Sequence, residues 1–205
     1  VRGTVKDVQG NPIAGVVVTD GKNMTATDNR GMYLLDTDPV RQPMVYISTP
    51  ADYVLPEKNG IADGFYRYQD AGKTENQCDF ILQKREKKTD EFVFIPISDP
   101  QVKNEKQLER FRSETIPDLV YTVDSLNVPE TIGMQLGDLV WDAMNLYTPY
   151  RTTISNLGLT MFQVMGNHDF NLQYADMERT AEPAKGYGEK NYYEMFGPTD
   201  YSFNV

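Results

Sequence analysis

Three short acidic segments contain the side chains of this chain that could carry out chemistry. Carboxylate and amide oxygens bind hard divalent cations, and an imidazole can pass a proton to or from a substrate. Side chains of these kinds together are typical of metal-assisted hydrolysis. The segments are, in chain order, Asp99-Pro100-Gln101, Gly137-Asp138 with Trp141-Asp142, and Gly166-Asn167-His168-Asp169.

Four side chains in these segments are candidate metal ligands, namely Asp99, Gln101, Asp138 and Asn167. A carboxylate at Asp138 could bridge two cations at the usual two-metal spacing of about 3.5–4 Å. Gly137 before it allows a close approach of the backbone. The amide oxygens of Gln101 and Asn167 are neutral and therefore weaker ligands. For Asp99 an alternative remains, in which its carboxylate only caps the end of a strand.

The one histidine of the chain, His168, is the candidate proton donor to the leaving-group oxygen of a substrate. We expect the carboxylate of Asp169 to orient this imidazole or to stabilise its charge. A purely structural histidine is the alternative. Asp142 is expected to cap the following helix, with a supporting role behind the site as the alternative. Trp141 is expected to pack or to form a pocket wall.

Each acidic segment follows an apolar run that is typical of a β-strand. The runs cover residues 92–97, 131–136 and 159–165. The first is typical of a strand buried on both faces of a sheet. Because helical patterns separate the runs, they predict a doubly wound arrangement of parallel strands. In such sheets the functional site lies at the carboxyl ends of the strands, and all three acidic segments fall there.

Two helices are expected between these strands, over residues 104–126 and 143–156. Asn104 has the side chain of an N-cap, and Pro117 must kink or split the first helix. Residues 201–205 resemble the start of another strand. Several aromatic side chains near the end of the chain could line a substrate cleft or form a buried helix face, namely Tyr187, Tyr192, Tyr193 and Phe196.

Residues 1–86 have the pattern of an all-β domain. Short β-branched runs about ten residues apart, separated by Gly, Asn and Asp turn signals, indicate a β-sandwich. The charged, apolar-free stretch 83–90 is interpreted as a linker, with a solvated strand end as the alternative. The domains predicted are therefore 1–86 and 87–205.

Charge and composition exclude some classes of partner. The formal net charge is −10. Nucleic-acid binding requires a stripe of basic side chains, so nucleic acid is not expected as a partner of such an acidic chain. An anionic substrate stays possible, because bound cations invert the local field. No apolar run of 18 residues is present, so no transmembrane segment is expected. The single Cys78 excludes an internal disulfide.

The first domain resembles a known module on three segments. They are the strand around Gly3, then Gly10-Asn11-Pro12-Ile13-Ala14-Gly15-Val16, then Thr27-Asp28-Asn29-Arg30-Gly31-Met32-Tyr33. These segments resemble the carboxypeptidase-regulatory or transthyretin-like β-sandwich. Such modules are similar to immunoglobulin folds and commonly precede enzymes in secreted bacterial proteins.

The three acidic segments resemble the first three motifs of calcineurin-like metallophosphoesterases. The resemblance implies that Asp99 and Asp138 are metal ligands, with Asp138 bridging, and that Asn167 binds metal and phosphate. It implies that His168 donates the proton. Two departures are present: Gln101 stands where a histidine is usual, and the later histidine motifs are absent from the 205 residues. An amide in place of imidazole favours Mn²⁺ or Mg²⁺ over Zn²⁺.

The fold expected is an Ig-like or transthyretin-like β-sandwich followed by the N-terminal part of a metallophosphoesterase α/β sandwich. The function expected is hydrolysis of a phosphate ester with two divalent cations, Mn²⁺ before Mg²⁺, Fe or Zn²⁺. We expect weak metal binding and slow turnover by these 205 residues alone. A non-catalytic binding protein with a degenerate phosphatase-like domain is the alternative. The resemblance implies a secreted, periplasmic or cell-surface location.

Overall fold

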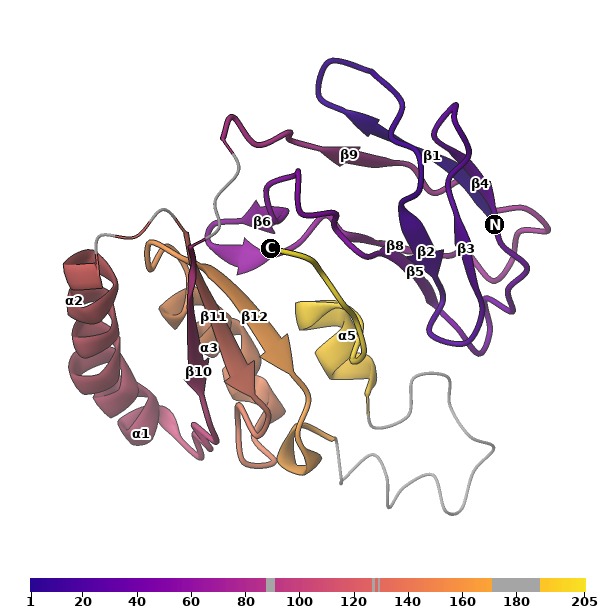
Figure 1. The fold of residues 1–205 in the computed structure, drawn as a ribbon. Coiled ribbons are helices and arrows are strands. Elements are labelled where there is room, and N and C mark those ends of the chain that lie inside the picture. Colours follow the sequence, from indigo (N-terminus) through magenta and orange to yellow (C-terminus); the bar gives the residue numbers. More distant parts are fainter. Residues whose placement is uncertain (88–90, 127, 129, 171–188) are drawn as a thin grey trace, which may run out of the picture. The chain divides into compact units, whose positions relative to one another are not determined.

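The computed structural model describes residues 1–87, 91–126, 128, 130–170 and 189–205 (Figure 1). The chain divides into two compact units. The first unit comprises Val1–Lys58, Asp63–Lys88 and Asp200–Val205, and the second comprises Asn59–Ala62 and Thr89–Thr199.

The first unit contains two β-sheets. The smaller sheet has the order β4-β1-β9, in which β1 is antiparallel to β4 and parallel to β9. The larger has the order β3-β2-β5-β8 and is antiparallel throughout. The strands of these two sheets are β1 (Arg2–Asp7), β2 (Val17–Thr19), β3 (Met24–Ala26), β4 (Met32–Leu34), β5 (Met44–Ile47), β8 (Tyr66–Tyr68) and β9 (Phe80–Leu82). The short β6 (Glu57–Lys58) belongs to neither of them.

Aspartates begin two of the tight turns between these strands. Asp7 Oδ1 accepts backbone N–H bonds from Gln9 (2.9 Å) and Asn11 (2.8 Å). Asp28 Oδ1 accepts them from Arg30 (2.8 Å) and Met32 (2.9 Å). A short acidic side chain that hydrogen-bonds its own backbone is a known way to fix a turn. Because these turns end one strand and reverse the chain, the predicted β-segments on either side of them form separate strands.

The second unit contains a parallel sheet built from the three expected strands. They are β10 (Val93–Ile97), β11 (Thr131–Leu136) and β12 (Thr160–Val164), paired in that order. The short β7 (Ile61–Ala62), which the sequence pattern did not predict, lies parallel to β12. The register aligns Ile95 with Gly133 and Gly133 with Met161, so these three residues lie on one face.

The first predicted helix is present but divided. Helix α1 (Glu105–Arg110) begins at the expected N-cap, where Asn104 Oδ1 accepts the Gln107 N–H at 3.0 Å. A π-helix, η1 (Phe111–Thr115), then leads into α2 (Ile116–Leu126). The division lies just before Pro117, which cannot donate the backbone hydrogen bond of a regular helix. The remaining helices are the 3₁₀ turns η2 (Met144–Leu146) and η3 (Asn167–Asp169), with α3 (Tyr147–Thr153) and α5 (Lys190–Phe196).

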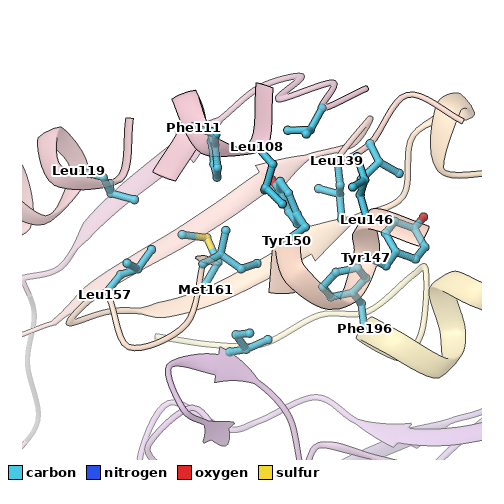
Figure 2. Close-up of a cluster of buried hydrophobic side chains, with 14 of the residues drawn as sticks. Leu108, Phe111, Leu119, Leu139, Leu146, Tyr147, Tyr150, Leu157, Met161 and Phe196 are labelled. Carbon is cyan, nitrogen blue, oxygen red and sulfur yellow. The ribbon is translucent and has the colours of Figure 1, made fainter. Parts of the chain in front are cut away.

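One hydrophobic core holds these helices to the sheet (Figure 2). Leu108 and Met161 are fully buried in it, and the ring of Phe111 stacks on Tyr150 with centroids 5.4 Å apart. Burying a side chain of this size contributes about 1.5–3 kcal/mol. Tyr192 and Phe196 of α5 belong to the same core, so the buried helix face is the correct interpretation for them. Tyr187 lies outside the described residues.

The expected burial of the first strand on both faces is wrong. Strand β10 lies at the edge of the sheet and pairs with β11. Its side chains alternate, and Phe94 is 44% exposed. Leu136, on the same face by register, is 46% exposed. Buried residues of the described helices share one core with Met161, which lies on the face opposite Phe94.

The ends of the predicted segments also differ from expectation. The stretch interpreted as a linker begins with β pairing, because Val54 donates to the Gln83 carbonyl (2.8 Å) and Lys84 bridges Tyr53. Residues 88–90 lie outside the described part. At the carboxyl end, Phe203 forms an isolated bridge to Thr49 within the first unit. The described helices include none long and apolar enough to cross a membrane.

Candidate active site

The structure brings the three acidic segments together at the carboxyl ends of β10, β11 and β12. The Gln101 N–H donates to the Asp138 carbonyl at 2.8 Å. The His168 N–H donates to Asp138 Oδ1 at 2.9 Å, and the Asp142 N–H donates to the His168 carbonyl at 3.1 Å. Backbone hydrogen bonds therefore connect the first loop to the second, and the second to the third.

The backbone of these loops is strained at several non-glycine residues. Positive φ angles occur at Asp99 (45°), Gln101 (47°), Asp138 (48°) and Asp142 (53°). A left-handed conformation costs roughly 1–2 kcal/mol for a residue with a Cβ atom. Such strain persists where surrounding contacts enforce it, and it collects at functional sites. Four such residues in two loops make this edge of the sheet a candidate functional region.

Gly166 is required by the close approach of two loops. A Cβ atom at this position would lie 2.1 Å from both the backbone nitrogen and Oδ1 of Asp138. Asp138 itself is buried, with 7% of its surface exposed. Its Oδ1 accepts the His168 N–H, and its Oδ2 accepts Gln101 Nε2 at 3.3 Å. The central carboxylate is thus fixed from two sides.

The imidazole of His168 is held by a carboxylate and by an aromatic ring. Its Nδ1 lies 3.2 Å from both carboxylate oxygens of Asp142. The ring stacks on Trp141 with centroids 3.6 Å apart and an interplanar angle of 19°. A proton on Nδ1 would therefore point at Asp142 and leave Nε2 for a substrate. The His168 side chain keeps 18% of its surface exposed.

The expected role of Asp169 is corrected by the structure. Its carboxylate is fully buried and accepts backbone N–H bonds from Gly166 (2.9 Å), Leu139 (3.1 Å) and Val140 (3.2 Å). Burial raises the pKa of Asp169, the three N–H donors oppose this rise, and the nearby Asp138 carboxylate adds to it. Asp169 therefore holds the second and third loops together, and it does not contact the imidazole.

Asp142 takes the place that was expected for Asp169. The helix-cap interpretation of Asp142 is wrong, because the N-cap of η2 is Ala143, without a side-chain hydrogen bond. Its carboxylate instead faces His168. One feature of the sequence favours a contact between Asp142 and His168: Asp142 lies in the same loop as Asp138, next to Trp141. That signal competes with the equally common use of aspartate before a helix.

Lys103 is a residue of the site that the sequence did not single out. Its Nζ lies 3.9 Å from the centroid of the Trp141 ring, as in a cation–π interaction. Since the His168 imidazole covers one face of Trp141 at 3.6 Å, the ammonium must lie over the other face. Lys103, Trp141 and His168 therefore form three layers beside Asp138.

The remaining candidate ligands are more peripheral. Asp99 and Asn167 are exposed residues that follow β10 and β12. Gln101 contacts Asp138 but presents its Nε2, so its amide would have to turn over to offer Oε1 to a cation. Three or more His, Cys, Asp or Glu side chains do not gather as a metal site within the described ranges. The oxygen atoms present fit part of the shell of a hard divalent cation.

A family model matches the first part of the chain. Residues 1–85 match the model described as the N terminal of calcineurin-like phosphoesterase. The match supports a relationship to calcineurin-like phosphoesterases, and the mixed α/β arrangement agrees with it. No curated protein and no solved structure matches the chain. The three loops lie after the matched residues, so the match and the geometry of the loops are separate observations.

Proposed function

We propose that the chain carries the acidic loops of a metal-dependent phosphoesterase, a hydrolase acting on a phosphate ester. The observation that carries this proposal is the arrangement of Asp138, His168 and Asp142. A buried carboxylate lies beside an imidazole that a second carboxylate orients, at the carboxyl ends of parallel strands. The family match over residues 1–85 supports the same class of activity.

Asp138 is the central ligand in this proposal, with Asp99, Gln101 and Asn167 as further oxygen ligands. One or two bound cations would supply a water of lowered pKa and would neutralise charge on the phosphoryl oxygens. The absence of any histidine from the ligand set favours Mn²⁺ or Mg²⁺ over Zn²⁺. Substitution of Asp138 by Asn should therefore weaken Mn²⁺ binding.

His168 donates the proton to the leaving oxygen from Nε2. Asp142 stabilises the charged imidazolium and keeps Nδ1 protonated, and Trp141 limits rotation of the ring. Asp169 acts on this geometry indirectly, because its buried carboxylate fixes Gly166 and the backbone of the second loop. Each role follows from a contact of this chain's own residues.

Two further proposals concern the whole protein. The two sheets of the first unit form a sandwich of the Ig-like or transthyretin-like type, as the glycine and turn spacing favours. The protein acts outside the cytoplasm of a bacterium, as the resemblance to secreted enzymes implies. A cleavable export signal in the complete reading frame would test the second proposal.

The test of the activity is hydrolysis of p-nitrophenyl phosphate with and without Mn²⁺. We expect slow, Mn²⁺-dependent release of nitrophenol, lost in His168→Asn and strongly reduced in Asp138→Asn. The variant Glu109→Gln, on the exposed side of α1, is the matched control and should keep the wild-type rate. A rate independent of Mn²⁺, or equal in wild type and both site variants, would contradict the proposal.

A non-catalytic binding protein is the second candidate. It is favoured by two observations: both oxygens of Asp138 already accept N–H donors, and no group of three His, Cys, Asp or Glu side chains gathers as a metal site in the described segments. Mn²⁺ binding that depends on Asp138 without any turnover would support this candidate. Turnover abolished by His168→Asn would exclude it.

A further inference from the structure

A polar pocket of about 250 Å³ adjoins the candidate site within the second unit. One wall is the loop that carries Gln101, and the other is the helical segment that runs from α1 into η1. Because the Gln101 amide also contacts Asp138, the pocket lies directly beside the proposed ligands. Its polar lining side chains are Gln101, Gln107, Arg110, Glu114 and Thr115.

The two charged residues of this pocket neutralise each other. Arg110 donates through Nε and Nη2 to the two carboxylate oxygens of Glu114, at 3.1 and 2.9 Å. The hydrogen bonds from Arg110 and its charge hold the pKa of Glu114 below its usual value. The pair forms a rim, since both side chains remain more than half exposed. The pocket therefore offers fixed donors and acceptors without a net charge.

Such a lining selects the chemistry of an occupant. A phosphate group would meet the Glu114 carboxylate, and an apolar group would cover the polar atoms of this lining without hydrogen-bonding them. A hydroxyl group both donates and accepts, so neighbouring hydroxyls can use the donors and lone pairs that Arg110 and Glu114 keep beside their mutual bonds. The volume lies below the roughly 300–1,000 Å³ of drug-sized sites, which suits a single sugar-sized group and not a polymer.

The helical wall of the pocket has an unusual backbone geometry, and the segment with this geometry supplies part of the pocket lining. Residues Phe111–Thr115 form a π-helix, a conformation that is rare and frequently found at functional sites. It contributes Glu114 and Thr115 to the pocket. Arg112 and Glu109 form a comparable ion pair on the same segment, and neither lines the pocket. The pocket wall is therefore marked by the π-helix and by the position of the Arg110–Glu114 pair, and not by the presence of an ion pair as such.

We propose that this pocket binds the alcohol part of the phosphate-ester substrate, and that this alcohol is a hydroxyl-rich group such as a sugar or polyol. The location of the phosphate beside Asp138 rests on the proposed function. Arg110 and Glu114 are then specificity-determining residues. They recognise the leaving group without taking part in proton transfer.

The experiment compares glucose 6-phosphate with p-nitrophenyl phosphate as substrates of the Mn²⁺-loaded chain. Glu114→Gln and Arg110→Gln should each lower kcat/KM for glucose 6-phosphate about 5–10-fold, the size expected for one or two lost hydrogen bonds. The value for p-nitrophenyl phosphate should change less than twofold. Glu109→Gln, which breaks the pair outside the pocket, should change neither value.

A binding measurement without metal separates this proposal from the proposed function. Saturation-transfer NMR with free glucose should show contact with the wild-type chain and with Glu109→Gln, and a weaker signal with Glu114→Gln. This result without any turnover would uphold the pocket and overturn the phosphoesterase. No transfer to wild type, or equal transfer in all variants, would overturn the pocket. Equal losses for both ester substrates would also overturn it.

Discussion

At the scale of single residues, the pairing of His168 with Asp142 is the feature that the chemistry depends on. The three loops could be named as candidate site loops from the sequence, because a segment with Gly, Asn, His and Asp in this order has few other interpretations. The exchange of roles between Asp142 and Asp169 was not predictable. Asp142 has a φ of 53°, and the side-chain direction of a left-handed residue does not follow from strand or helix spacing.

Replacement of Asp142 by Asn tests this pairing. The amide keeps the size of the carboxylate but does not stabilise an imidazolium, so kcat should fall about 10–100-fold, less than the roughly 10²–10⁴-fold that a general acid–base group itself contributes. KM and Mn²⁺ affinity should stay within about twofold. An unchanged kcat would contradict the role of this carboxylate.

Replacement of Gly166 by Ala tests the close contact of the loops. The added methyl group would lie 2.1 Å from the Asp138 carboxylate oxygen, so one loop must move. We expect a loss of about 1–3 kcal/mol in the free energy of unfolding, measured by urea denaturation. Gly72→Ala in the first unit, where the added atom would first meet a flexible Asp70 oxygen at 3.2 Å, is the control. Equal losses in both variants would refute the contact.

At the scale of secondary-structure elements, local sequence signals predicted the strands of the second unit and the start of the first helix. The contacts of these elements depend on pairing between distant segments, which local signals do not reveal. The apolar run 92–97 gave the right strand but the wrong burial, because the sequence does not reveal that β10 lies at an edge. Pro96 is compatible with that position, since an edge strand can spare a hydrogen bond. The π-helix before Pro117 had no sequence signal beyond the proline itself.

The N-cap of α1 can be tested by Asn104→Ala. Loss of the bond from Gln107 N–H to Asn104 Oδ1 should lower the free energy of unfolding by about 1 kcal/mol. Asn104→Asp keeps an acceptor and adds a favourable charge at the helix start, so it should retain wild-type stability. Thermal denaturation of the two variants measures the difference. Equal stability of Asn104→Ala and wild type would argue against the cap.

The hydrogen-bonded carboxylate of Asp28 should make the folding stability of the first unit depend on pH in the acidic range. Its pKa is lowered by the backbone N–H groups of Met32 and Arg30 and by the Arg30 charge. A lowered folded-state pKa stabilises the fold above the unfolded-state pKa of about 3.9, and this contribution is lost as the pH falls through the folded-state pKa. The variant Asp28→Asn should therefore be less stable than wild type at pH 7.

The difference between Asp28→Asn and wild type should shrink as the pH falls below about 4, because the Asp28 carboxyl becomes protonated first in the unfolded chain and then, through its lowered pKa, in the folded protein. Thermal midpoints measured across this range supply the comparison. The pairing of Asp28 with backbone donors predicts the larger midpoint for wild type at neutral pH. A difference that is constant with pH would show that charge on Asp28 does not matter.

At the scale of the whole molecule, the chain joins a β unit that matches a phosphoesterase family model to an α/β unit that carries three acidic loops. The sequence pattern placed the boundary between two domains at residues 86 and 87. It did not predict that residues 59–62 supply β7 to the second unit, or that residues 200–205 belong to the first. Such exchanges depend on distant pairings, and short strands leave little pattern.

The central claim is that these loops form an oxygen-rich metal site centred on Asp138. Trp141 is the one tryptophan of the chain and stacks on His168, so its fluorescence reports on this site. The most direct measurement is a Mn²⁺ titration of that fluorescence in wild type, Asp138→Asn and the control Glu109→Gln. We expect saturable quenching in wild type and the control, with affinity at least tenfold weaker in Asp138→Asn. Identical titrations in all three proteins, or none that saturates, would contradict it.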